Sequence, residues 1–263
     1  MKFPYFSAPK PRFLGHRGAA GHAPENTLLS FETAAPYVAY LETDAWLTRD
    51  GVPVFLHDQS LSRTCGVDQK ISELTWNEVQ SFDAAHTFSI DGGTSFPHRG
   101  RGHKIPSVES ILKRFPEKFF NIELKDSRPE AASKLIETLR KCDALDRVLL
   151  AAEHDHVMQR LRAEKPDIVP TSAAYGEVHA FLMWLLKGAP RGEYATEAAA
   201  FQIPHVWESH DLAKPEMIGA LHQMGIEVHY WTINDPALVE KLLAVGADGI
   251  VTDFPELAAD FLP

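Results

Sequence analysis

Residues 40–58 read YLETDAWLTRDGVPVFLHD, and this stretch decides how the strands of the chain are counted. It holds two candidate strands, Tyr40–Leu47 and Val52–Asp58, with only residues 48–51 between them. Parallel neighbours need a crossover of about a dozen residues, so these two strands are expected to pair as an antiparallel hairpin. The Asp50-Gly51 pair predicts a two-residue turn of type I′. That turn places Asp44 opposite His57.

Short β-branched or aliphatic runs continue along the chain with helical segments between them, which is the pattern of βα units around a parallel sheet. When the hairpin is counted as an extension of the second strand, the candidate strands number eight. We therefore predict an α/β fold, a (β/α)8 TIM barrel, in one domain over residues 1–263. The candidate strands are Phe13–Gly18, Tyr40–Leu47 with Val52–Asp58, Phe119–Lys125, Val148–Glu153, Ile168–Ser172, Ala200–Pro204, Glu227–Ile233 and Asp248–Asp253.

Local signals place several helices and one insertion. Residues about 59–104 break into Gly, Ser, His and Arg clusters, so we expect an insertion after the His57-Asp58 strand that carries one helix, Thr75–Phe82. N-cap residues predict helix starts at Asn26, Ser107 and Asp235. Helical spacing of apolar residues over 178–186 predicts a helix that either faces the core or lines a pocket over the rim of the barrel.

Composition limits the possible partners and compartments. The chain has 26 Lys plus Arg against 36 Asp plus Glu, a formal net charge of −10, which disfavours nucleic-acid binding. Cys65 and Cys142 are too few for a disulfide framework, and the first residues carry no apolar run of signal-peptide length. The longest apolar stretch is too short to span a bilayer. We expect a cytoplasmic protein without stable membrane insertion; the sequence leaves its oligomeric state open.

Three carboxylates fall at the ends of predicted strands, where active sites of such barrels are built. Glu42 and Asp44 are two residues apart, so both point to the same side of a strand, and Glu123 ends another strand. Three acids without Cys or clustered His predict a site for Mg²⁺ or Ca²⁺. The alternative is that salt bridges with Arg17 and Lys125 alone neutralise these acids.

Two histidines and two cations lie at the same rim. His16 and His57 come from different strands and are suited to general acid and general base catalysis, although the sequence does not tell which is which. Arg17 offers a planar fork for two phosphate oxygens, and Lys125 offers a point charge. With a divalent cation, these groups would neutralise a phosphodiester in its transition state. The combination therefore predicts a phosphoester substrate.

Seven short motifs occur in one order between residues 14 and 257: His16-Arg17-Gly18, Pro24-Glu25-Asn26-Thr27, Glu42-Thr43-Asp44, His57-Asp58, Glu123-Leu124-Lys125, Tyr230-Trp231-Thr232-Ile233-Asn234 and Gly246-Ala247-Asp248-Gly249-Ile250-Val251-Thr252-Asp253-Phe254-Pro255. In this ordered set the chain resembles the glycerophosphodiester phosphodiesterase family. The resemblance implies a barrel with an insertion after the His-Asp strand. It also implies a divalent-metal hydrolase that releases sn-glycerol 3-phosphate and an alcohol.

The same resemblance implies roles for individual residues. It makes His16 and His57 the acid-base pair and makes Trp231 the aromatic wall against the glycerol moiety. The metal ligands are then Glu42, Asp44 and Glu123, and the phosphate contacts are Arg17 and Lys125.

Two other functions fit the sequence. The apolar stretch near residues 178–186 favours a lysophospholipase D with the same catalytic set and a pocket for an apolar group. A non-catalytic phosphate-binding module is the alternative of another class. The alcohol headgroup and the choice between Mg²⁺ and Ca²⁺ are open.

Overall fold

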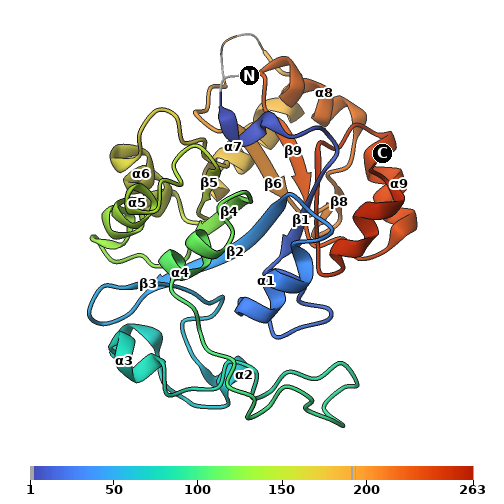
Figure 1. Cartoon of the computed structure of the whole chain (residues 1–263). Coiled ribbons are helices and arrows are strands. Elements are labelled where there is room, and N and C mark those ends of the chain that lie inside the picture. Colours follow the sequence, from blue (N-terminus) through green and yellow to red (C-terminus); the bar gives the residue numbers. More distant parts are fainter. Residues whose placement is uncertain (1–2, 191, 193, 263) are drawn as a thin grey trace.

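The computed structural model describes residues 3–190, 192 and 194–262. Seven parallel strands form its sheet: β1 (Arg12–His16), β2 (Tyr40–Leu47), β4 (Phe119–Leu124), β5 (Val148–Ala151), β6 (Ala200–Ile203), β9 (Glu227–Tyr230) and β10 (Gly249–Thr252). They curl in the order β5-β4-β2-β1-β10-β9-β6 (Figure 1).

A short segment closes the ring where an eighth strand was expected. Of the predicted strand Ile168–Ser172, only Thr171 and Ser172 form bridges: Thr171 pairs with Leu150 of β5 and Ser172 with Ala200 of β6. The predicted (β/α)8 barrel is therefore confirmed.

Helices surround this barrel (Figure 1). Fully buried side chains such as Phe31, Phe120 and Phe201 fill the main apolar core that includes residues of both the sheet and the helices. Within the described residues, no helix combines the length and apolar character needed to cross a bilayer, and location in the cytoplasm stays a prediction. The helices are α1 (Leu28–Ala34), α4 (Val108–Arg114), α5 (Ala131–Lys141), α6 (Asp155–Glu164), α7 (Tyr175–Leu186), α8 (Pro215–Gln223) and α9 (Pro236–Ala244), with 3₁₀ turns η1 (Pro4–Ser7) and η3 (Pro255–Asp260) and a small hairpin of β7 (Val206–Trp207) and β8 (His210–Asp211).

The predicted hairpin after β2 is present, but its register differs by one residue. β3 (Pro53–Phe55) pairs antiparallel with β2, and Ala45 lies opposite Phe55. The Leu56 backbone N donates to the Asp44 carbonyl at 3.0 Å, so Asp44 faces Leu56 and not His57.

The length of the turn explains this shift. The Thr48 backbone N donates to the Val52 carbonyl at 3.0 Å, which leaves three residues in the loop instead of two. Gly51 takes a left-handed conformation with φ +82°, as expected for the last residue of a three-residue hairpin loop. His57 lies beyond the end of β3 at Phe55, so the alternation of side chains along a strand does not set its direction. Its side chain still reaches the cavity described below.

Two of the three predicted N-caps are confirmed. Ser107 and Asp235 accept hydrogen bonds from the first turns of α4 and α9. The prediction of Asn26 as an N-cap is wrong, because Thr27 caps α1 and Asn26 lies outside the helix with φ +55°. Its amide instead donates to Asp44 Oδ2 at 3.3 Å. The asparagine therefore supports a carboxylate of the site.

The segment between β3 and α4 packs on the edge of the barrel and has an apolar cluster of its own (Figure 1). It contains α2 (Ser62–Cys65), η2 (Ile71–Glu73) and α3 (Trp76–Val79). The predicted helix Thr75–Phe82 is shorter than expected: Thr75 caps it in a capping box with Glu78, and it ends at Val79. The buried members of the cluster are Val54, Leu56, Leu61, Cys65, Ile71, Leu74, Val79, Ala84 and Ile105.

Candidate active site

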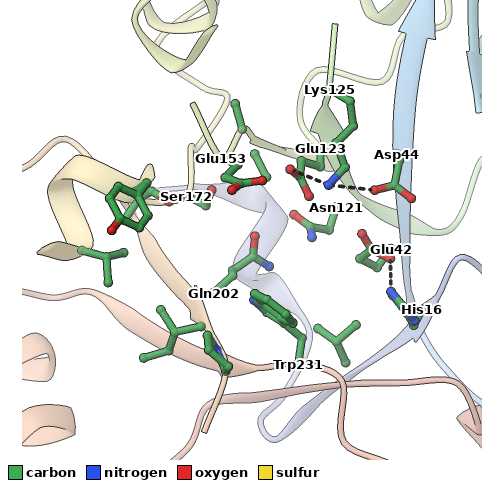
Figure 2. Close-up of a pocket in the computed structure, with 18 of the residues that line it drawn as sticks. His16, Glu42, Asp44, Asn121, Glu123, Lys125, Glu153, Ser172, Gln202 and Trp231 are labelled. Atoms are coloured by element: carbon green, nitrogen blue, oxygen red, sulfur yellow. Dashed lines mark hydrogen bonds and ion pairs between the residues drawn. The ribbon is translucent and has the colours of Figure 1, made fainter. Parts of the chain in front are cut away.

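A cavity of about 510 Å³ opens where the carboxyl ends of the barrel strands meet (Figure 2). It brings together every residue that the sequence assigns to catalysis, metal binding or substrate binding. Carboxyl ends of parallel strands share one face of a barrel, which is why residues far apart in the sequence converge there. The eight residues are His16, Arg17, Glu42, Asp44, His57, Glu123, Lys125 and Trp231.

Strand register places the three carboxylates next to one another. Asp44 of β2 pairs with Glu123 of β4, and Glu42 of β2 pairs with His16 of β1. The Lys125 Nζ lies 2.8 Å from Glu123 Oε1 and 3.6 Å from Asp44 Oδ1 (Figure 2). The cluster is thus partly neutralised by a protein cation.

Burial makes this cluster less acidic than free carboxylates. Burial, followed by the charge of Asp44, raises the pKa of Glu42 from 4.5 to about 7. Burial also raises the pKa of Glu123, although the ammonium of Lys125 opposes the rise. Both shifts disfavour the charged form, and a nearby cation favours it. A positive charge placed among these oxygens would favour their ionised form.

Each of the two histidines has its Nδ1 bonded to an aspartate. His16 Nδ1 donates to Asp253 Oδ1, and His57 Nδ1 donates to Asp58 Oδ1, both at 2.6 Å. Burial alone would lower the pKa of His16, but the hydrogen bond with Asp253 and the charge of Glu42 outweigh it, so the pKa is raised. A carboxylate on Nδ1 fixes the ring and leaves Nε2 for proton transfer.

Arg17 turns into the site from a backbone with φ +50°. Its backbone N donates to Glu42 Oε2 at 3.1 Å, and its Nη1 donates to Glu25 Oε1 at 3.0 Å. Its Nε lies 3.4 Å from Asp44 Oδ2 and is buried, with no hydrogen-bond partner among the residues described. Carboxylates on two sides thus hold the guanidinium in place, and one buried N–H remains for an acceptor.

Sequence reasoning missed the roles of two polar residues here. Asp253 ends the last predicted strand, where it could either cap the helix that follows or face a ligand; the structure bonds it to His16. Asn121 lines the cavity and pairs with Glu42 in the strand register, and within the described part of the chain its buried Oδ1 has no hydrogen-bond partner. The signal for Asn121 was present, because it stands two residues before Glu123 and so points to the same side of β4.

Another wall of the cavity is apolar. Val178 and Leu182 of α7 line it together with Trp207 and Leu212. Phe181 of the same helix is fully buried in the main core. The helix therefore has both of the roles that the sequence left open, with one face in the core and another in the cavity.

The fold and this cavity define the class of protein: an enzyme built on a TIM barrel, whose cavity brings together histidines, carboxylates and the cations Arg17 and Lys125. Residues 16–257 match the family described as "Glycerophosphoryl diester phosphodiesterase family". The chain belongs to this family, and it is a phosphodiesterase.

Relatives cover nearly the whole chain. The "Probable glycerophosphodiester phosphodiesterase 2" of Mycobacterium tuberculosis is 29% identical over 271 residues, which cover 97% of this chain and 95% of the relative. The "Lysophospholipase D GDPD3" of Mus musculus is 27% identical, over 95% of this chain and 82% of the relative. The structure of a phosphodiesterase of Oleispira antarctica in complex with the product sn-glycerol-3-phosphate superposes with a TM-score of 0.75 at 25% identity, over 95% of this chain and 96% of that chain.

Proposed function

We propose that the protein hydrolyses glycerophosphodiesters to sn-glycerol 3-phosphate and an alcohol. The observation that carries this proposal is that two aspartate-bonded histidines line one cavity with Arg17 and Lys125. Two oriented imidazoles suit an acid and a base, and two cations suit a phosphodiester. The relative from Oleispira antarctica, crystallised with sn-glycerol-3-phosphate, supports the choice of a glycerol ester.

We also propose that Glu42, Asp44 and Glu123 hold Mg²⁺ or Ca²⁺. Among residues 3–190, 192 and 194–262, no three His, Cys, Asp or Glu side chains form a ready metal site, and Lys125 contacts two of these acids. The donor set nevertheless fits a hard divalent ion, because three carboxylates lie beside the unpartnered Oδ1 of Asn121. The raised pKa of Glu42 supports the same assignment, since an added cation would relieve the repulsion.

The residues of the chain divide the work of the reaction. Arg17 contacts the phosphate oxygens through its guanidinium group, and Lys125 places its ammonium beside them. The Nε2 atoms of His16 and His57 exchange protons with the attacking and the leaving oxygen. A bound divalent ion would polarise a phosphoryl oxygen. Trp231, with 46% of its surface exposed at the cavity, is proposed as the wall for the glycerol moiety.

The test is release of glycerol 3-phosphate from sn-glycero-3-phosphocholine by the purified protein, with added Mg²⁺ or Ca²⁺ and with a chelator. We expect product with the ion and little with the chelator. Binding of the ester without product would favour a phosphate-binding module. Equal turnover in the chelator would remove the metal from the proposal and leave the hydrolase.

A second candidate function is that of a lysophospholipase D. The apolar wall formed by Val178, Leu182 and Leu212 favours it, because an acyl chain could lie there. The printed name of the mouse relative points the same way. The measurement that separates the two is kcat/KM for sn-glycero-3-phosphocholine against a lysophosphatidylcholine. A preference for the acylated compound would replace the first proposal.

A further inference from the structure

Among the residues that the structure describes, no side chain is paired with the carboxylate of Glu153 in the cavity. Glu153 follows β5, lines the cavity and is turned towards it beside Glu123 (Figure 2). In the part of the chain that the structure describes, no ion pair or side-chain hydrogen bond involves this carboxylate; its charge raises the pKa of Glu123. Glu153 is exposed, and its charge is suited to a cationic group of a ligand rather than to the phosphate anion.

The surroundings of Glu153 add no positive charge. Glu153 also borders a second hollow, which is lined by Asp155, His154, His156, Gln159 and Tyr175 and by no Lys or Arg. The two cations of the main cavity contact acids other than Glu153: Lys125 contacts Glu123 and Asp44, and Arg17 contacts Glu25 and Asp44. Among the described residues, therefore, neither hollow pairs a Lys or Arg with Glu153.

Two aromatic rings meet at a corner beside Glu153. The Tyr175 backbone N donates to the Glu153 carbonyl at 2.9 Å, which fixes the start of α7 next to the acid. The rings of Tyr175 and Trp207 lie 6.1 Å apart, centroid to centroid, at 81° to each other, and both line the cavity. The edge of one ring thus packs on the face of the other, and Tyr175 remains 55% exposed. An exposed aromatic face in a cavity that also holds a carboxylate suits a quaternary ammonium group, which binds by cation–π attraction and charge.

We propose that Glu153, Tyr175 and Trp207 form a subsite for the cationic alcohol of the substrate, with a trimethylammonium group as the preferred ligand. This inference rests on the proposed function and gives it a substrate class. The phosphodiester lies against Arg17 and Lys125, and the alcohol extends towards the aromatic corner. The positive end of the alcohol then supplies the partner that Glu153 lacks.

The experiment compares two esters that differ by one atom. The first is sn-glycero-3-phosphocholine; the second is its 3,3-dimethylbutyl analogue, in which carbon replaces the charged nitrogen and the shape is kept. For the wild-type protein we expect kcat/KM for the choline ester to exceed that for the neutral ester about tenfold, mainly through KM. Glu153→Gln should bring this ratio close to one, and Glu153→Lys should invert it.

A matched control removes the same charge elsewhere. Glu197 is exposed and precedes β6, at the opposite end of the barrel, so Glu197→Gln should keep the wild-type ratio. Tetramethylammonium gives a second readout: we expect competitive inhibition of the wild type that weakens in Glu153→Gln. A thermal melt of each variant checks that the fold is kept.

The outcomes separate this inference from the function on which it rests. Cleavage of both esters with equal kcat/KM by the wild type would overturn the cationic subsite and leave the hydrolase in place. A preference for the choline ester that persists in Glu153→Gln would overturn it too. So would a strong preference for lysophosphatidylcholine together with equal kcat/KM for the choline and neutral esters, because an acyl chain would then occupy this wall. Cleavage of neither ester would overturn the proposed function itself.

Discussion

Arg63 donates to both carboxylate oxygens of Glu25, at 2.5 and 2.6 Å, although the two residues are 38 positions apart. Its Nε also donates to Asp58 Oδ2 at 2.5 Å. Asp58 accepts from His57, and Glu25 accepts from Arg17. One arginine of α2 therefore connects the partner of a proposed catalytic histidine with the partner of a proposed phosphate ligand.

This relationship predicts that Arg63→Gln lowers turnover although Arg63 does not line the cavity. Without the guanidinium, Asp58 and Glu25 lose a shared donor, and His57 and Arg17 become less well fixed. We expect kcat to fall about tenfold, with a shift of the pH profile because the carboxylate on His57 is less well held. Arg63→Lys should restore little of the lost kcat, since an ammonium cannot form the paired contact with Glu25.

The control for this variant is Arg49→Gln. Arg49 is also exposed and pairs with an acid of the inserted segment, Glu78, but it does not contact a partner of the site. The Arg49→Gln variant should therefore keep the wild-type pH profile of kcat. If both variants change kcat equally, Arg63 acts only through the stability of the segment, and the positioning role is wrong.

The two histidines should each be required for turnover. For His16→Ala and for His57→Ala we expect kcat to fall by a factor of about 10² to 10⁴, the usual contribution of a proton-transfer group. Steady-state kinetics with sn-glycero-3-phosphocholine measures this, and circular dichroism checks the fold. His22, which is paired with Glu256 and does not line the cavity, provides the control as His22→Ala. Full activity in either cavity variant would remove that histidine from catalysis.

Asp253 should affect kcat through its hydrogen bond with His16. Asp253→Asn keeps the shape but removes the charge that raises the pKa of His16 and fixes its Nδ1–H. We expect kcat to fall about 10- to 10³-fold with little change of KM, and the proton of His16 to be lost at lower pH. An NMR titration of the His16 ring measures the pKa directly. Asp235→Asn is the control, because asparagine caps a helix as well as aspartate does.

The barrel and its polar rim could be predicted because their signals are local. Each strand shows its own apolar run, and the residue that ends a strand of a barrel lies at the site. The register of the hairpin could not be predicted, because it depends on the length of the loop. The loop has three residues and ends at the left-handed Gly51, whereas a two-residue turn at Asp50-Gly51 was expected. Sequence spacing does not distinguish these turns.

Long-range partners were also beyond prediction. An asparagine before a helix has the same local pattern whether it caps the helix or, as Asn26 does, contacts Asp44. Asp253 bonds a histidine 237 positions away, so only the closed barrel reveals the pair. Glu153 follows β5, whereas the three proposed metal ligands lie within strands, and only the structure shows that no described side chain is paired with its carboxylate.

The last prediction concerns the pH dependence of the proposed metal site. The pKa of Glu42 is about 7 in the folded protein and 4.5 without the fold. Between these values the folded chain binds more protons than the unfolded chain, so this group lowers the free energy of unfolding as pH rises from about 4.5 to 7. A divalent ion reverses the effect, because it binds the ionised carboxylate and displaces the proton.

We therefore expect Mg²⁺ or Ca²⁺ to raise Tm more at pH 7.5 than at pH 5.5, relative to the protein in a chelator. Glu42→Gln removes both the proton and the charged ligand, so its Tm should respond less to the ion and should depend less on pH through this window. Glu197→Gln should respond as the wild type does, since it changes the same charge far from the cavity. A rise in Tm that is equal at both pH values would show that the ion binds elsewhere, because binding at Glu42 requires that its carboxyl group lose a proton.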